Sequence, residues 1–110
     1  MTAEFATVVL VEFPFADSAT TKRRPALVLA DAGDGDLLLA RISTRPAASP
    51  SDVPVAHWQT AGLLAPSCIR LQKLATIHSG LIVRALGTLH DGDAATVARA
   101  LTAFVQGMSR

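Results

Sequence analysis

Two side chains near the ends of separate apolar segments could act together on an anionic group: the guanidinium of Arg24 and the hydroxyl of Ser43. Arg24 begins an apolar run that reaches Ala30, and Ser43 lies near the end of a second run over residues 37–44. A guanidinium is planar and stays protonated, so it can hold two oxygens of one phosphate or carboxylate. A hydroxyl can donate one more hydrogen bond to the same group. This chemistry requires the two side chains to meet in the fold.

The residues between the two runs decide whether they meet. Residues 31–36 read Asp-Ala-Gly-Asp-Gly-Asp, which tolerates positive φ and predicts the turn of a β-hairpin. A turn centred on residues 33–34 places Arg24 directly opposite Ser43, and a turn one position later shifts the pairing by two residues. Because side chains alternate along a strand, both registers keep Ser43 on the face of Arg24, whereas a shift of one residue would bring Thr44 there. The alternative interpretation is that Arg24 is solvated and hydrogen-bonds a neighbouring strand.

The rest of the chain predicts further strands. Residues 7–13 form an apolar, β-branched run closed by Pro14, which is typical of a strand with both faces covered. Residues 14–23 are polar without helical periodicity and indicate a long loop. Shorter extended segments are expected after the hairpin, with a helical turn or bend at 58–64; these segments are 53–57, 67–77 and 81–89.

A helix is expected at the C-terminal end. Apolar residues recur at helical spacing over 94–108, and Asp91 or Asp93 offers an N-cap ahead of them. Several strands followed by one helix predict an α+β fold, a small, partly open β-barrel packed against a helix, in a single domain over 1–110.

Composition excludes several classes of protein. No apolar run approaches the roughly 20 residues that span a bilayer, and the N-terminal segment does not resemble a signal peptide, so a cytoplasmic location without membrane contact is expected. The single cysteine, Cys68, is expected to be a buried core residue. The net charge of +1 does not argue for a nucleic-acid partner, but basic residues outnumber the one acid, Asp52, between residues 41 and 84. That segment is either a phosphate-facing surface or a solvated basic face.

Three stretches of the sequence stand in an informative order. They are residues 9–15 (Val-Leu-Val-Glu-Phe-Pro-Phe), 22–29 (Lys-Arg-Arg-Pro-Ala-Leu-Val-Leu) and 40–44 (Ala-Arg-Ile-Ser-Thr). A strand, a variable loop, an Arg-Pro strand start and an apolar-Ser/Thr strand end in this order resemble the PemK/MazF toxins of bacterial toxin–antitoxin modules. The resemblance continues to the final helix through Gly62-Leu63 and the segments 66–71, 74–77 and 86–89.

The resemblance implies an SH3-like (CcdB/MazF-type) β-barrel with a C-terminal helix, a homodimer and a cognate antitoxin. It also implies sequence-selective cleavage of single-stranded RNA, without metal or cofactor, to a 2′,3′-cyclic phosphate and a 5′-hydroxyl. In the family, the Arg before the Pro and the Ser or Thr after the apolar strand residue carry catalysis; here these are Arg24 and Ser43. A guanidinium suits this chemistry because in-line attack of a 2′-hydroxyl builds charge on the phosphoryl oxygens.

Six further residues are candidates for binding the substrate: Asp17, Lys22, Arg23, Thr44, Ser67 and Arg70. The segment with Asp17 and Lys22 differs from the Gly- and Glu-containing loops of the best-known members, so its contacts do not transfer, and both residues suit a solvated loop equally well. Ser67 and Arg70 match a segment that lines the family's groove, with strand packing and solvation as the alternative. The three histidines fit no zinc-binding spacing, so structural or surface roles are favoured for them.

Two other function classes stay open. A non-enzymatic poison of DNA gyrase is one, because the CcdB toxins share this barrel and fold does not fix function. A non-catalytic SH3-like binding module is the other. The pairing of Arg24 with Ser43 favours RNA cleavage, because a gyrase binder does not need it.

A homodimer is also expected from the residues: a first strand apolar on both faces leaves one surface for a symmetry mate.

Overall fold

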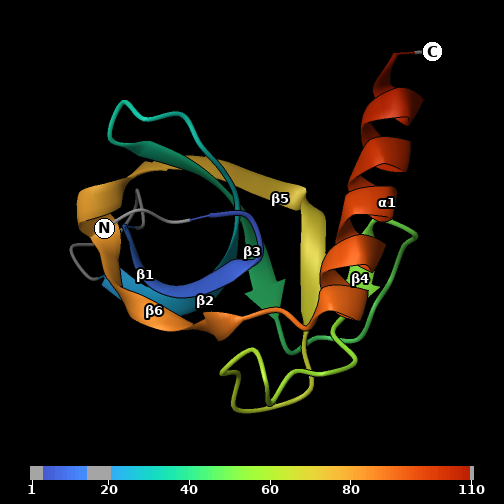
Figure 1. The fold of residues 1–110 in the computed structure, drawn as a ribbon, viewed down its shortest axis with the longest axis horizontal. Coiled ribbons are helices and arrows are strands. Elements are labelled where there is room, and N and C mark those ends of the chain that lie inside the picture. The colour runs from blue at the N-terminus through green and yellow to red at the C-terminus, as the bar shows by residue number, and fades with distance from the viewer. Residues whose placement is uncertain (1–3, 15–20, 110) are drawn as a thin grey trace.

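The computed structural model describes residues 4–14 and 21–109. The elements, in chain order, are β1 (Thr7–Pro14), β2 (Thr21–Asp31), β3 (Asp36–Ser43), β4 (Asp52–Pro54), β5 (Cys68–His78), the 3₁₀ turn η1 (Ser79–Leu81), β6 (Ile82–Thr88) and α1 (Asp91–Met108). All strand pairs are antiparallel. They form one six-stranded sheet in the order β4-β5-β3-β2-β1-β6, which curls around itself, with α1 beside the end that carries β4 and β5 (Figure 1).

The curl is not closed by hydrogen bonds. β4 and β6 are the two edges of the sheet, and no pairing joins them within the part of the chain that the structure describes. β4 is short and ends at Pro54, which has no N–H to extend a ladder. The expected barrel is therefore confirmed only in part, as a curled antiparallel sheet with a C-terminal helix.

Each face of the curled sheet carries a hydrophobic core of its own. One core lies between the sheet and α1 and includes Val8 and Leu27 of the sheet and Val97 of the helix. The other lies on the opposite face and includes Val9 and Val11. Strand β1 thus buries both faces inside the same chain, because the curl folds the sheet over its second face. The argument that β1 leaves an apolar face for a symmetry mate is wrong.

The predicted hairpin is confirmed, but its turn is longer than expected. Residues 32–35 lie between β2 and β3, Asp31 pairs with Leu37, and Gly33 and Gly35 have φ angles of 81° and 94°. The register then shifts by one residue between Val28 and Ala30, so that Leu29 is the extra residue of a β-bulge. Beyond the bulge, Ala26 pairs with Arg41.

This bulge decides which hydroxyl faces Arg24. Two residues beyond the pair Ala26–Arg41, the same register brings Arg24 level with Ser43. An unbroken ladder from the turn would have placed Thr44 there. The pairs of β2 with β3 end at Ala26 and Arg41, so this register places Ser43, rather than Thr44, on the face of Arg24, and a bulge rather than a two-residue turn produces it.

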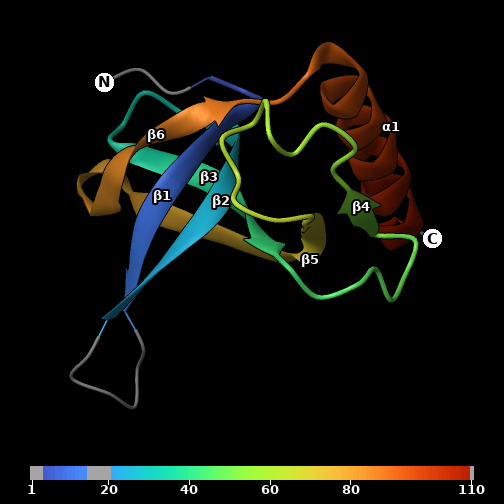
Figure 2. The ribbon, with the colours of Figure 1, turned by 90° about the horizontal axis from the view of Figure 1, so that it is seen from below.

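The segment between β1 and β2 contains more strand than expected. The two strands pair as far as Pro14 and Thr21, and Figure 2 shows them as a long two-stranded ribbon. Lys22 and Arg23 therefore belong to β2 and not to a loop. Their polar side chains do not interrupt pairing, because the ladder is made by the backbone, and Arg23 lies directly opposite Glu12. The short strand expected over 53–57 is reduced to β4.

The helix begins earlier than expected, and its N-cap is His90 rather than Asp91 or Asp93. His90 Nδ1 accepts a hydrogen bond from the N–H of Gly92 at 3.1 Å. Asp93 is buried, and its carboxylate accepts from the N–H groups of Ala56 at 3.1 Å and His57 at 2.9 Å. It therefore ties α1 to the segment after β4. None of the described helices has the length and hydropathy that crossing a membrane requires.

Two glycines lie where the 55–66 segment packs closely against β6. Gly62 has a φ of 81°, and a Cβ on it would lie 2.1 Å from the carbonyl oxygen of Leu86. A Cβ on Gly87 would lie 2.7 Å from the carbonyl oxygen of Ala61. Two stretches of backbone thus pack against each other where no side chain fits.

Candidate active site

A cavity of about 900 Å³ opens where β2 begins and β3 ends. Arg24, from β2, and Ser43, from β3, both line it. They belong to the sheet face of Val28 and Leu39, since side chains two residues apart share a face. The structure therefore brings together the two residues that the sequence selected as catalytic.

Pro25 helps to open this cavity. It lies on β2 directly after Arg24 and pairs with Leu10 of β1, whereas pairing of β2 with β3 is recorded only from Ala26 onward. A proline has no N–H to donate, so it suits the point at which a ladder stops. The start of β2 is thus left attached to β1 alone, and the space beside the end of β3 stays open.

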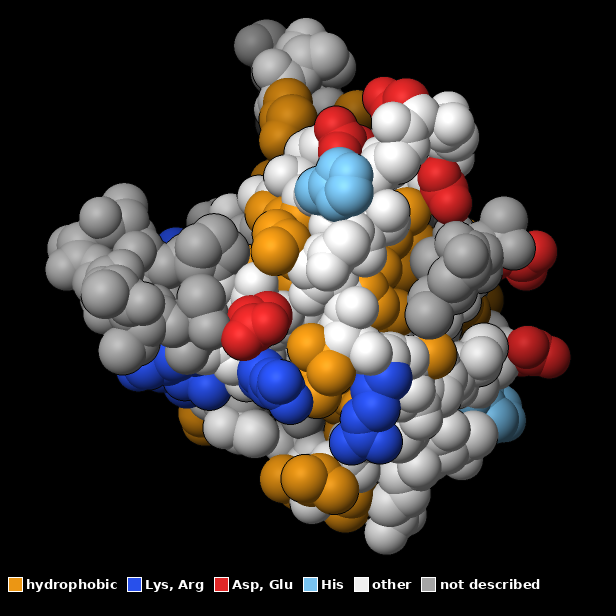
Figure 3. Space-filling model, turned by 90° about the vertical axis from the view of Figure 1, so that its left-hand side faces the viewer, with side chains coloured by type: hydrophobic (Ala, Val, Ile, Leu, Met, Phe, Trp, Pro, Cys, Tyr) orange, Lys and Arg blue, Asp and Glu red, His pale blue; other side chains and the backbone are white. Residues whose placement is uncertain are grey.

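The lining of the cavity is strongly basic. Its charged residues are Arg24, Arg41, Arg45, Arg70 and Lys73, and no acidic residue of the described segments lines it. Four of these five come from the basic stretch between residues 41 and 84, so that stretch largely faces one cavity. In Figure 3, Lys and Arg side chains form a row from the lower left to the lower middle of the view, beside exposed hydrophobic side chains, while most acidic side chains lie at the top and right. Such a lining suits an anion.

Arg24 keeps most of its hydrogen-bonding capacity for a ligand. Its side chain is exposed, and one Nη1 hydrogen bond goes to the carbonyl oxygen of Arg23 at 3.3 Å. Within residues 4–14 and 21–109 no carboxylate pairs with it. A guanidinium has five N–H donors, so those that remain can bind a phosphate bidentately.

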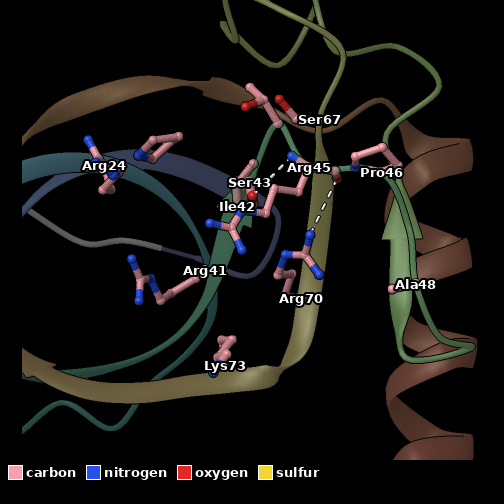
Figure 4. Close-up of a pocket in the computed structure, with 12 residues that line it drawn as sticks. Arg24, Arg41, Ile42, Ser43, Arg45, Pro46, Ala48, Ser67, Arg70 and Lys73 are labelled. Carbon is pink, nitrogen blue, oxygen red and sulfur yellow. Dashed lines mark hydrogen bonds between the residues drawn. The ribbon is translucent and has the colours of Figure 1, made fainter.

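Ser43 is oriented by the backbone that follows it. Its Oγ accepts a hydrogen bond from the N–H of Arg45 at 3.1 Å, drawn as a dashed line in Figure 4. A hydroxyl has one proton and two lone pairs, so accepting this bond leaves the proton available. The half-buried Ser43 can therefore donate to an anion in the cavity.

Arg70 shapes the wall of the cavity. Its Nη1 donates to Asp52 Oδ2 at 3.1 Å. Its Nη2 donates to the carbonyl oxygen of Arg45 at 3.4 Å, the second dashed line in Figure 4. The Asp52 side chain is only 6% exposed, and the same oxygen accepts from the N–H of Ala48 at 2.8 Å. This pair fixes the loop that carries Arg45 and Ala48, so a part of Arg70 is already engaged before any ligand binds.

Only some of the other proposed binding residues line the cavity. Ser67 lines the cavity, but it is buried and its hydroxyl donates to the carbonyl oxygen of Ala65 at 2.8 Å. Thr44 is exposed and lines the cavity as well. Lys22 and Arg23 lie nearer the start of β2 than Arg24 does, and they do not line the cavity. Asp17 lies outside the described residues.

Three of the basic lining residues belonged to the basic stretch between residues 41 and 84, but sequence reasoning did not single them out as binding residues: Arg41, Arg45 and Lys73. A signal for Arg41 was present, because it precedes Ser43 by two residues and so shares its strand face. Arg45 and Lys73 gave no such signal. Lys73 lies within an irregularity of β5, between Arg70, which pairs with Arg41, and Leu74, which pairs with Ala40.

The histidines have structural contacts away from this cavity. His57 stacks on His90 with the ring centroids 4.0 Å apart, and His57 Nδ1 lies 3.6 Å from Asp93 Oδ2. His78 Nδ1 accepts from the N–H of Gly80 at 2.9 Å and caps η1. None of the three lines the cavity.

Comparison with known proteins gives the family. No curated protein matches the sequence. Among solved structures, an endoribonuclease in complex with its cognate antitoxin from a mycobacterial species aligns with a TM-score of 0.77 and 13% identity, over 96% of each chain. The MazF of a MazE–MazF complex from Deinococcus radiodurans aligns with a TM-score of 0.76 and 19% identity, over 96% of this chain and 98% of that one.

The Mycobacterium tuberculosis toxin MazF-mt6 aligns with a TM-score of 0.68 and 24% identity, over 87% of this chain and 95% of that one. At such identities these likenesses establish the fold. The sequence itself matches the PemK-like, MazF-like toxin family of type II toxin–antitoxin systems over residues 4–105, nearly its whole length. The chain, with its curled sheet and its Arg24–Ser43 cavity, belongs to this family of toxins.

Proposed function

We propose that this toxin is an endoribonuclease that cleaves single-stranded RNA through the 2′-hydroxyl of its substrate. The observation that carries the proposal is that Arg24 and Ser43 line one basic cavity, each with hydrogen-bond donors left for an anion. Such a lining fits a polyanion, and the meeting of a guanidinium with a hydroxyl fits a reacting phosphate. Membership of the toxin family and the titles of similar structures support the same activity.

The reaction follows from the two side chains. The substrate's 2′-oxygen attacks the adjacent phosphorus, a P–O2′ bond forms, and the P–O5′ bond breaks. The 2′-hydroxyl loses its proton, the 5′-oxygen gains one, and the products are a 2′,3′-cyclic phosphate and a 5′-hydroxyl. Arg24 holds two phosphoryl oxygens on which charge develops, and Ser43 donates to the phosphate or orients the 2′-hydroxyl.

The proposal includes two protein partners. A cognate antitoxin silences the toxin, and an acidic, extended antitoxin segment matches the basic cavity; solved toxin–antitoxin complexes share this fold. The toxin is a cytoplasmic homodimer with the SH3-like barrel of its family. Since β1 is covered within the chain, we place the dimer contact elsewhere; Val105 and Met108 on α1 are 53% and 64% exposed.

The test is cleavage of an unstructured RNA by the purified toxin in excess EDTA. We expect cuts at a few sites, with cyclic phosphate ends identified by mass spectrometry. Single-stranded DNA of the same sequence should stay intact, because it has no 2′-hydroxyl. An absolute requirement for added magnesium, or DNA cutting at a comparable rate, would contradict the mechanism.

Ser43 and Thr44 provide a matched pair of hydroxyl deletions. Ser43→Ala is expected to slow cleavage clearly, but less than loss of Arg24, because an orienting donor is removed while the charged group stays. Thr44→Ala should be milder: Thr44 also lines the cavity, but it follows β3, whereas Ser43 is the strand residue on the face of Arg24. Single-turnover rates of the two variants measure this difference. A dead Thr44→Ala protein beside an active Ser43→Ala protein would show that the site assignment is wrong.

A further inference from the structure

Arg41 is a half-buried arginine without a carboxylate partner. It lies on β3, two residues before Ser43, and lines the same cavity. Among the described residues, no ion pair involves it. Removing a charge from water is costly unless an opposite charge or several hydrogen bonds replace the water. This guanidinium is therefore prepared for an anionic ligand.

The direction of the Arg41 side chain distinguishes it from Arg24. Its Cζ lies 5.4 Å from the ring centroid of Phe13, a cation–π distance. Phe13 belongs to β1, whereas Ser43 belongs to β3, and β2 with Arg24 lies between these strands. The Arg41 guanidinium thus points from β3 toward β1, to the side of the cavity on which β2 and Arg24 lie. Figure 4 shows Arg41 extending toward the side of Arg24, away from Arg70.

This arrangement provides two separate places for phosphates. A phosphate held by both Arg24 and Ser43 lies between β2 and β3. A group held by Arg41 beside Phe13 lies toward β1. Two such places suit successive phosphates of a single strand that crosses β2.

We propose that Arg41, held by the ring of Phe13, binds the phosphate adjacent to the scissile one. The inference rests on the proposed endoribonuclease function and deepens it. Arg41 then sets the position of the strand, while Arg24 and Ser43 act on the reacting phosphate. Its contribution lies in affinity for a chain of several phosphates rather than in the chemical step.

The experiment measures binding separately from cleavage. The probe is the shortest RNA that the wild-type toxin cleaves, made uncleavable by replacing the 2′-hydroxyl at the mapped site with hydrogen. Each phosphate in turn is replaced by a neutral methylphosphonate, and dissociation constants are measured by fluorescence anisotropy. The variants are Arg41→Met, which keeps an apolar stem without the charge, and Phe13→Leu. Arg99→Ala is the control, because it removes one arginine from the exposed face of α1.

We expect Arg41→Met to weaken binding roughly 10- to 100-fold, the loss typical of a charge-assisted contact. The slope of log affinity against log salt should fall by about 0.7, as for one phosphate contact on a single strand. Neutralising one phosphate next to the scissile position should weaken binding to the wild type but add little in Arg41→Met. Phe13→Leu should weaken binding a few-fold, and Arg99→Ala should leave it unchanged.

The outcomes separate this inference from the proposed function. Arg41→Met with wild-type affinity, at an unchanged melting temperature, would overturn the inference while RNA cleavage by the wild type stands. Coupling of Arg41 to the scissile phosphate itself would also overturn it. A wild-type toxin that neither cleaves nor binds RNA would overturn both proposals. A folded Arg41→Met protein whose single-turnover rate at saturating RNA equals that of the wild type supports a role in binding.

Discussion

Replacing Arg24 by lysine is expected to slow RNA cleavage about 100- to 1,000-fold, nearly as much as replacing it by alanine. Lysine keeps the positive charge but loses the planar fork that holds two phosphoryl oxygens at once. The cavity already contains four other basic residues, so charge alone is not scarce there. What Arg24→Lys removes is the geometry of the contact. The measurement is the single-turnover rate on an RNA with one mapped cleavage site.

Arg23 supplies the matched control. It is the neighbouring residue on the same strand, but its side chain points to the other side of the sheet and does not line the cavity. Arg23→Lys should cleave at close to the wild-type rate. Both variants should keep the wild-type melting temperature, because Arg24 and Arg23 are exposed. An Arg24→Lys protein that cleaves at the wild-type rate would remove Arg24 from the centre of the mechanism.

Replacing Gly62 by alanine is expected to reduce the free energy of unfolding by about 3–5 kcal/mol, the largest stability change that we foresee for a single methyl group. Two causes add. The residue has a φ of 81°, and its new Cβ would lie 2.1 Å from a backbone oxygen of Leu86. A flexible side chain could move aside, but β6 can move only by disturbing its pairing with β1. Urea denaturation of the pure protein measures the change.

Gly33 separates the two causes. It has the same φ of 81°, but a Cβ there would have no atom within 4 Å. Gly33→Ala should therefore cost only the backbone strain, about 1–2 kcal/mol. Asparagine tolerates a positive φ, so Gly33→Asn should be nearly neutral while Gly62→Asn stays strongly destabilising. Equal losses for Gly62→Ala and Gly33→Ala would show that the close approach to Leu86 is not a constraint.

The parts of the fold that sequence could predict are those with local causes. Alternation of apolar residues and the turn-forming composition of residues 31–36 were enough for the hairpin. The same alternation placed Arg24 and Ser43 on one face. The resemblance to the toxin family then supplied what periodicity could not, the catalytic roles of Arg24 and Ser43. The constraint at Gly62 was not predicted, because it lies in a contact with a strand far along the chain.

The parts that escaped prediction depend on distant contacts. An acid in the first turn of a helix normally suggests a cap, but Asp93 is turned toward the backbone of Ala56 and His57, and no local pattern announces that contact. The second covered face of β1 results from the curl of the whole sheet. Arg70 looked like a ligand-binding residue, but its buried partner Asp52 lies across the β4–β5 pair.

The bulge at Leu29 has a consequence for how freely this toxin can change in length. A bulge lets the ladder take up one added or lost residue. The number of residues in the turn therefore does not fix which way the side chains at the far end of the hairpin point. The tip around Gly33 and Asp34 is exposed and lies remote from the cavity along both strands. We therefore expect insertions there, such as a peptide epitope or a labelling tag, to be tolerated without loss of activity.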